Sequence, residues 1–198
     1  MTYRAWPLCV ALLLPAAVPA GAATFTLLDD VGRSVVMNGP PERIVAMLDA
    51  FLPEMLHIII EKRLGMVDKI LGDGILAVFG HPYGGDDDLD AGLRAAADMQ
   101  AAMVEMGPIF DRLGMPRMQL GIGMNFGSVL VCHIGSKQHS ENTIIGQPVN
   151  LAAKMEDIAP AREVVLAAPG VEHLRARNSA LAGLLEPGRI DRFFILAI

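Results

Sequence analysis

The sequence has few cysteines, no cluster of basic residues and no long apolar run after its first two dozen residues. It contains two cysteines. Because Cys9 lies in the N-terminal apolar segment, Cys132 is alone in the rest of the chain, and an intrachain disulfide framework is excluded there. The net charge is −6, and the Lys and Arg residues are not clustered in the sequence. The sequence therefore lacks the basic patch that is typical of a nucleic-acid-binding protein. A phosphate-bearing substrate would need local cations or a metal ion.

Apolar residues are abundant, at 53% of the 198 residues. Beyond the first two dozen residues, however, no apolar run approaches the length that spans a bilayer. The length fits one domain with a hydrophobic core, and it is too short for two full domains once the N-terminus is discounted.

The first 23 residues have the layout of a secretory signal peptide. Arg4 precedes an apolar stretch at residues 5–17, and residues 20–22 form a small-residue cleavage site. Three prolines in this segment argue against a stable membrane-spanning helix, since each removes a backbone donor. We therefore expect a cleaved export signal at residues 1–23 rather than a retained anchor, followed by one domain at residues 24–198.

Strand and helix patterns alternate along the rest of the chain. Residues 67–80, VDKILGDGILAVFG, form two apolar runs around a Gly-Asp-Gly turn, which predicts a hairpin with Asp73 at its tip. Helical spacing predicts a helix over 46–63. The same reasoning predicts short strands on both sides of an acidic turn in 24–47, helices at 91–106, 146–159 and 171–177, a strand pair at 118–134 that bends at its glycines, and strands at 162–168 and 188–198. This order predicts an α/β sandwich with helices on one or both faces.

Two patterns have structural interpretations. No helix follows the glycines at 121–127, so they do not form a dinucleotide-binding loop. The aspartates of the 86–90 run precede a predicted helix, and we interpret them as N-terminal capping residues rather than as a metal cluster.

Four motifs in consistent order resemble the catalytic domain of the class III nucleotidyl cyclases, which make cyclic nucleotides from nucleoside triphosphates. They are VDKILGDGILAVFG, GIGMNFGSVLV, IGSKQHSENTIIGQPVNLAAKME and GRIDRFFIL. The resemblance runs from about residue 46 to the C-terminus, and it extends back to Thr24 if residues 24–47 are included. It implies an α/β (α+β) fold, the ferredoxin-like βαββαβ-type sandwich of the cyclase catalytic domain.

The resemblance also implies a metal site. Cyclisation is an in-line attack of the ribose 3′ hydroxyl on the α-phosphorus, which expels pyrophosphate and uses two ions, Mg²⁺ or Mn²⁺. By resemblance, Asp73 is the second of two metal-binding aspartates. Asp30 is expected to be the first, with Asp29 as a neighbour that can substitute.

Further site residues follow from the same resemblance. Lys69 matches the position that hydrogen-bonds the purine ring, and Thr143 matches its partner in base selection, a pair of the adenine type that favours ATP over GTP. Asn150 matches the ribose-orienting residue. Lys154, on the same helical face, replaces a transition-state-stabilising Arg and so predicts lowered activity. Arg189 lies near the cation that contacts the terminal phosphates.

The resemblance further implies a homodimer with sites at the interface, because each chain of the family holds half of each site. The polar segment 135–143 resembles the dimerisation arm. The predicted function is therefore an adenylate cyclase that takes ATP, with no nucleic-acid partner.

A second resemblance leaves an alternative open. Behind the signal-like start, residues 24–47 are similar to the start of periplasmic solute-binding proteins of the siderophore and corrinoid type. The alternative is an exported non-catalytic or ligand-binding protein, or a fused or degenerate cyclase homologue.

The sequence gives two opposed indications of localisation. The catalytic domain is expected on the cytoplasmic side, whereas residues 1–23 indicate export. Membrane association would involve only a retained N-terminal segment.

Overall fold

The computed structural model describes residues 6–16, 24–28, 34–38, 41–85, 87–136, 140–187 and 193–196. Its strands are β1 (Trp6–Ala16), β2 (Thr24–Leu28), β3 (Ser34–Asn38), β4 (Met66–Leu71), β5 (Gly74–Phe79), β6 (Gln119–Gly135), β7 (Ser140–Ile145), β8 (Val164–Ala167), β9 (Leu185–Pro187) and β10 (Phe193–Leu196). Its helices are α1 (Pro41–His57), α2 (Asp88–Glu105), α3 (Gly107–Leu113), α4 (Gln147–Ile158) and α5 (Ala168–Ala176), with a π-helical segment η1 (Ile58–Lys62) and a 3-10 helix η2 (Ala180–Leu184).

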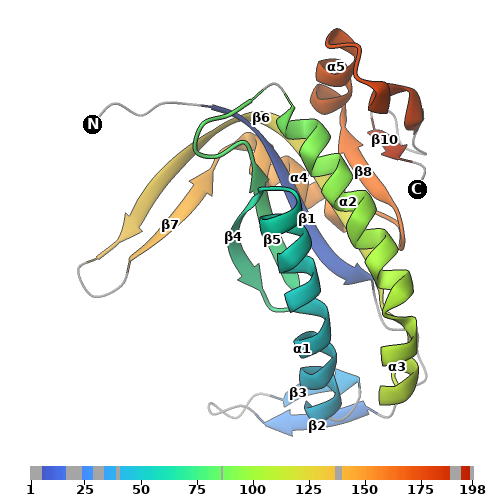
Figure 1. The fold of residues 1–198 in the computed structure, drawn as a ribbon. Helices are drawn as coiled ribbons and strands as arrows, with labels where there is room; N and C mark the ends of the chain where they lie inside the picture. The colour runs from blue at the N-terminus through green and yellow to red at the C-terminus, as the bar shows by residue number, and fades with distance from the viewer. Residues whose placement is uncertain are drawn as a thin grey trace.

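One large sheet organises these elements (Figure 1). Its strand order is β4-β5-β1-β6-β8-β10-β9, and β7 pairs with β6 outside this path. Neighbours pair antiparallel except β6 and β8, which are parallel. Strands β2 and β3 form a separate two-stranded sheet. Figure 1 also shows the β6–β7 hairpin extending to one side as an arm.

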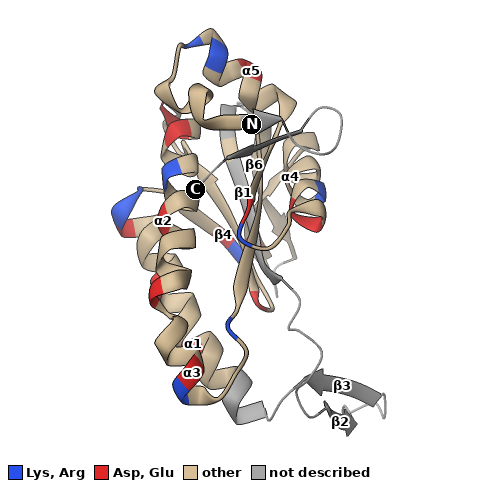
Figure 2. Ribbon diagram, turned by 90° about the vertical axis from the view of Figure 1, so that its right-hand side faces the viewer, with Lys and Arg blue, Asp and Glu red and all other residues tan. Residues whose placement is uncertain are grey.

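Helices cover both faces of the large sheet, and β5 shows why. Ile75, Ala77 and Phe79 pack in the main core with residues of α1 and α2, whereas Leu76 and Val78 pack in a second core with α4. Successive side chains of a strand point to opposite faces, so an apolar strand is buried on both. Figure 2 shows α1 and α2 on one side and α4 on the other. The predicted α/β sandwich is confirmed.

The apolar N-terminal segment lies in the middle of this sheet. Strand β1 pairs with β5, with Cys9 opposite Phe79 and Leu13 opposite Ile75, and with β6 on its other edge. Cys9 is fully buried. Strand β1 thus lies within the segment that we expected to be a signal peptide, because an apolar run suits a central strand as well as a signal peptide. The domain boundary after residue 23 and the expected cleavage both stay predictions.

Strand β6 corrects another expectation. It is one strand of 17 residues rather than a pair that bends at its glycines. These glycines allow α4 to lie directly on the sheet: a Cβ on Gly123 would be 2.1 Å from the backbone nitrogen of Glu156 and 2.3 Å from the backbone oxygen of Ala152. A Cβ on Gly127 would be 2.8 Å from Cγ of Pro148. Close approach of a helix backbone, not a turn, explains glycine here.

Most other predicted elements are confirmed with shifted ends. Helix α1 begins five residues before the predicted 46 and continues into η1, and the hairpin, α2, α4, β8 and α5 occur where expected. The prediction omitted α3, η2 and β9. No helix among the described residues combines the length and the apolar character needed to cross a membrane.

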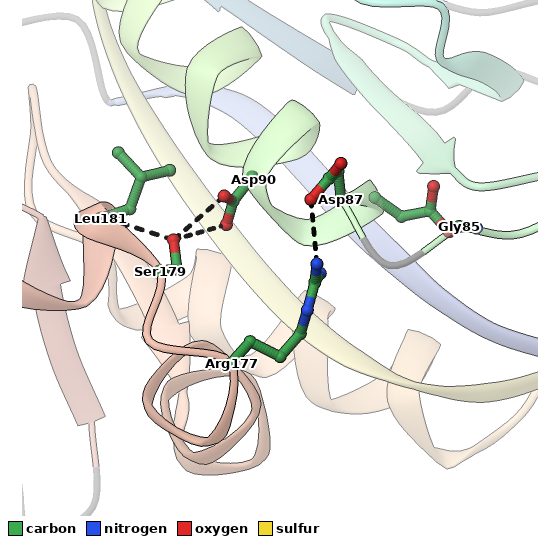
Figure 3. A network of polar contacts seen from close by, with 7 residues as sticks. Gly85, Asp87, Asp90, Arg177, Ser179 and Leu181 are labelled. Carbon is green, nitrogen blue, oxygen red and sulfur yellow. Dashed lines mark hydrogen bonds and ion pairs between the residues drawn. The ribbon is translucent and has the colours of Figure 1, made fainter.

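The acidic run at the start of α2 connects two parts of the chain (Figure 3). The Arg177 guanidinium donates to Asp87 at 3.0 Å, and the Ser179 hydroxyl lies 2.9 and 3.0 Å from the two oxygens of Asp90. Asp87 occupies the predicted capping position but makes no side-chain cap bond. These carboxylates therefore hold the end of α5 against the start of α2. Asp86 lies outside the described residues.

Candidate active site

The β4–β5 hairpin forms as predicted, with Gly72 and Asp73 as its two-residue turn. Gly72 has a φ of +68°, in the left-handed region that glycine adopts at low cost. Asp73 follows it and is exposed. The turn therefore presents the Asp73 carboxylate to solvent at the edge strand of the sheet.

Lys69 and Thr143, predicted as a pair, are in contact. Lys69 lies on β4 and Thr143 on β7, 74 residues later, and the Lys69 ammonium donates to the Thr143 hydroxyl at 2.8 Å. Thr143 is 8% exposed. Strand β7 pairs with β6 with Thr143 opposite Cys132, which brings its side chain against β4.

Asp68 is a third member of this group, and the sequence reasoning did not identify it. A bulge shifts the β4–β5 register, so that Val67 lies opposite Ala77 and Lys69 opposite Leu76, while Asp68 has no residue opposite it on β5. At a bulge, consecutive side chains need not point to opposite faces. Oδ2 of Asp68 lies 3.4 Å from Nζ of Lys69 and accepts from the Thr143 hydroxyl at 3.4 Å. Ordinary strand alternation places residues 68 and 69 on opposite faces, so only the bulge reveals this carboxylate.

Asn150 and Lys154 lie on α4, one turn apart, and both are exposed. The opposite side of this helix buries Ala152 and Met155 against the sheet. Among the described residues, no hydrogen bond or ion pair joins either side chain to Lys69 or Asp73. The helix thus presents the two predicted catalytic residues to the surface.

Glu156 is a second carboxyl group that the sequence reasoning missed. It lies on the buried side of α4 and is 8% exposed. Burial, with smaller contributions from the charges of Asp157 and Asp73, raises the pKa of Glu156 to about 7. The charge of Asp73, on the hairpin turn, is the smallest of these contributions.

The described residues do not by themselves form a two-metal site. Asp30 and Arg189 lie outside them. Of the two predicted metal ligands, Asp30 and Asp73, the structure therefore describes Asp73. Strand β1, which lies beside β5, contains no Asp or Glu. Among the residues that the structure describes, no group of three or more His, Cys, Asp or Glu side chains is arranged to hold a metal ion.

Comparison with known proteins identifies the family. The protein-family model of the adenylate and guanylate cyclase catalytic domain matches residues 23–184 of the sequence. The chain therefore belongs to this family. The match starts after β1 and includes Asp30.

Relatives and solved structures agree with this assignment. The uncharacterized protein Rv1319c of Mycobacterium tuberculosis is 35% identical over 146 residues, which cover 71% of this chain and 25% of that protein. Rv1318c of the same organism is 32% identical over 138 residues, 68% of this chain and 24% of that protein. The chain thus spans about a quarter of the length of these relatives.

Two cyclase structures resemble the fold closely. The adenylyl cyclase CyaB from P. aeruginosa has a TM-score of 0.77 at 19% identity, covering 100% of this chain and 97% of that chain. The guanylyl cyclase Cya2 has a TM-score of 0.74 at 22% identity, covering 98% and 92%. The fold is therefore that of the cyclase catalytic domain, which occurs with either nucleotide specificity.

Proposed function

We propose that the protein is an adenylate cyclase that converts ATP to cyclic AMP and pyrophosphate. The observation that carries this proposal is the contact between Lys69 and Thr143 at 2.8 Å. An ammonium group donates only, whereas a hydroxyl both donates and accepts. Adenine offers a ring-nitrogen acceptor beside an exocyclic amino donor, which this pair complements: Lys69 donates to the ring nitrogen and Thr143 accepts from the amino group. Guanine offers an N–H and a carbonyl at the same positions and opposes both groups.

The remaining roles belong to the proposal as well. Asn150 orients the ribose, Lys154 stabilises negative charge on the reacting phosphate, and Arg189 contacts the terminal phosphates. The Lys154 ammonium lacks the planar fork of an Arg guanidinium, and we therefore expect modest turnover. The exposed positions of Asn150 and Lys154 on α4 support a homodimer, because a second chain can bring these groups to the Lys69 and Asp73 of its partner.

Mg²⁺ or Mn²⁺ is the proposed cofactor, since hard cations of this kind prefer carboxylate oxygens. When bound, such ions neutralise charge on the transferring phosphate. Asp73 is one proposed ligand, and Asp30 is the other.

The test is direct. Purified full-length protein with ATP and Mn²⁺ is expected to form cyclic AMP, and Asp73→Ala should lower the rate by at least about a hundredfold. Asp87→Ala is a matched control, since Asp87 is an exposed carboxylate that pairs with Arg177 away from the hairpin. Product formation by wild type that does not exceed that of Asp73→Ala would contradict the proposal.

One observation favours a second candidate, a non-catalytic nucleotide-binding member of the family, exported or degenerate. Strand β1 supplies no carboxylate beside the Asp73 turn, so the metal site depends on Asp30. Protein that binds ATP but forms no cyclic nucleotide would support this candidate. N-terminal sequencing of the protein from cell fractions addresses its location: a start near Ala23 in the periplasm favours export, and an intact Met1 in the cytosol or membrane favours the enzyme.

A further inference from the structure

We infer that Asp68 determines nucleotide specificity by fixing the direction of the Thr143 hydroxyl. Its carboxylate accepts the hydrogen bond that the hydroxyl donates, so Thr143 presents an oxygen lone pair to the base and favours adenine. This inference rests on the proposed function, because it concerns how the same Lys69–Thr143 pair reads a purine.

The geometry closes a triangle of polar atoms. Nζ of Lys69 lies 2.8 Å from Oγ1 of Thr143, and both atoms lie 3.4 Å from Oδ2 of Asp68. The bulge in β4 makes this possible, because the unpaired Asp68 reaches the same partner as Lys69. A regular strand would place the two side chains on opposite faces.

Burial distinguishes Asp68 from the other carboxylate near Lys69. The Asp68 side chain is 3% exposed, whereas Glu141, which lies 3.5 Å from the ammonium, is 58% exposed. Interactions of an exposed pair are weakened by solvent. A buried group is shielded from water, and its hydrogen-bond direction is therefore set by the protein.

The two neighbours of the Thr143 hydroxyl fix the direction in which it donates its hydrogen bond. An ionised carboxylate only accepts hydrogen bonds, and an ammonium group only donates them. Thr143 has one proton and two lone pairs. The proton faces Asp68, one lone pair accepts from Lys69, and the second lone pair is available to the base. An amino group can donate to it, whereas a carbonyl oxygen would face it lone pair to lone pair.

A purely electrostatic role for Asp68 predicts something different. If the carboxylate only balanced the charge of Lys69, its removal would change the affinity for both purine nucleotides equally. The inferred role changes their ratio. The two roles are therefore separated by comparing nucleotides and not by the loss of activity alone.

The experiment uses Asp68→Asn in the full-length chain. The amide of Asn can donate to the Thr143 oxygen, and the hydroxyl can then donate its own hydrogen bond toward the base. The dissociation constants of 3′-deoxy-ATP and 3′-deoxy-GTP are measured by calorimetry, since neither can cyclise, and kcat/KM is measured for ATP and GTP. We expect the preference for the adenine nucleotide to fall about tenfold. The matched control, Glu141→Gln, removes a charge beside Lys69 and should leave the preference unchanged.

A second variant keeps the inference testable if Asp68→Asn does not fold. Thr143→Val removes the hydroxyl and should reduce the preference by a similar factor. An unchanged preference in Thr143→Val, an equal weakening of both nucleotides in Asp68→Asn, or a wild-type protein that binds neither deoxynucleotide selectively would overturn the inference. Selective binding without cyclic nucleotide formation would contradict only the proposed function.

Discussion

Single residues matter in this protein where a side chain departs from its usual environment, and Glu156 is the clearest case. Its pKa is raised to about 7, mainly by burial, from an ordinary value of 4.5. The folded protein therefore holds a proton that the unfolded chain releases between these two values. Stability should fall as pH rises through this window, because the unfolded state binds fewer protons there.

Replacement of Glu156 by Gln should remove this dependence. We expect Glu156→Gln to be more stable than wild type at pH 8 by roughly 1 to 3 kcal/mol, with little difference at pH 4. Urea unfolding at both pH values measures this. Asp157→Asn is the control, since Asp157 is exposed and contributes less to the shift. Parallel pH profiles for wild type and Glu156→Gln would refute the assignment.

The candidate site also shows what single residues reveal in the sequence. Lys69, Asp73, Thr143, Asn150 and Lys154 were found from motifs, and the structure joins the first and third of them directly. Asp68 and Glu156 were not found. The role of Asp68 depends on a bulge, and that of Glu156 on burial by a helix whose contacts are distant in sequence. Neither condition has a local sequence signal.

At the scale of elements, the contact between α4 and β6 positions the candidate site, because Asn150 and Lys154 lie on α4. Gly123→Ala places a methyl group within 2.1 Å of the Glu156 backbone, and the helix must move. We expect a loss of about 2 kcal/mol in the free energy of unfolding, together with reduced cyclase activity.

Gly183→Ala is the matched control for this contact. A Cβ there meets nothing within 4 Å, so its stability should stay within about 0.5 kcal/mol of wild type. Thermal or urea unfolding of both variants provides the comparison. Equal stability of Gly123→Ala and Gly183→Ala would show that α4 does not pack on β6 as closely as described.

Elements with local signals were the ones predicted well. The Gly-Asp-Gly turn specified the β4–β5 hairpin, because a two-residue turn demands residues that tolerate positive φ. The glycines of β6 misled the prediction, since glycine in a turn and glycine beneath a helix look alike in sequence. The strand at β1 was missed for a similar reason: an apolar segment of 11 residues does not reveal whether it will lie in a sheet or in a translocation channel.

At the scale of the whole molecule, β1 connects the two parts of the sheet. It lies between β5 and β6 and pairs along its length with β6, from Trp6 opposite Val129 to Ala16 opposite Gln119. Without it, β5 and β6 would each have an unpaired edge, and the core around Phe79 would be open. Unpaired edges of this kind template aggregation.

Removal of residues 1–23 therefore tests the fold as a unit. If β1 belongs to the domain, the shortened chain should lose cooperative unfolding and aggregate, whereas a chain that lacks residues 2–5 keeps β1 and should unfold like wild type. Circular dichroism during urea unfolding and size-exclusion chromatography measure both properties. A chain beginning at Thr24 that is monodisperse and as stable as the full chain would show that β1 is dispensable. In that case the strand Thr24–Leu28, which lies within the family match that begins at residue 23, becomes the candidate for the place beside β5.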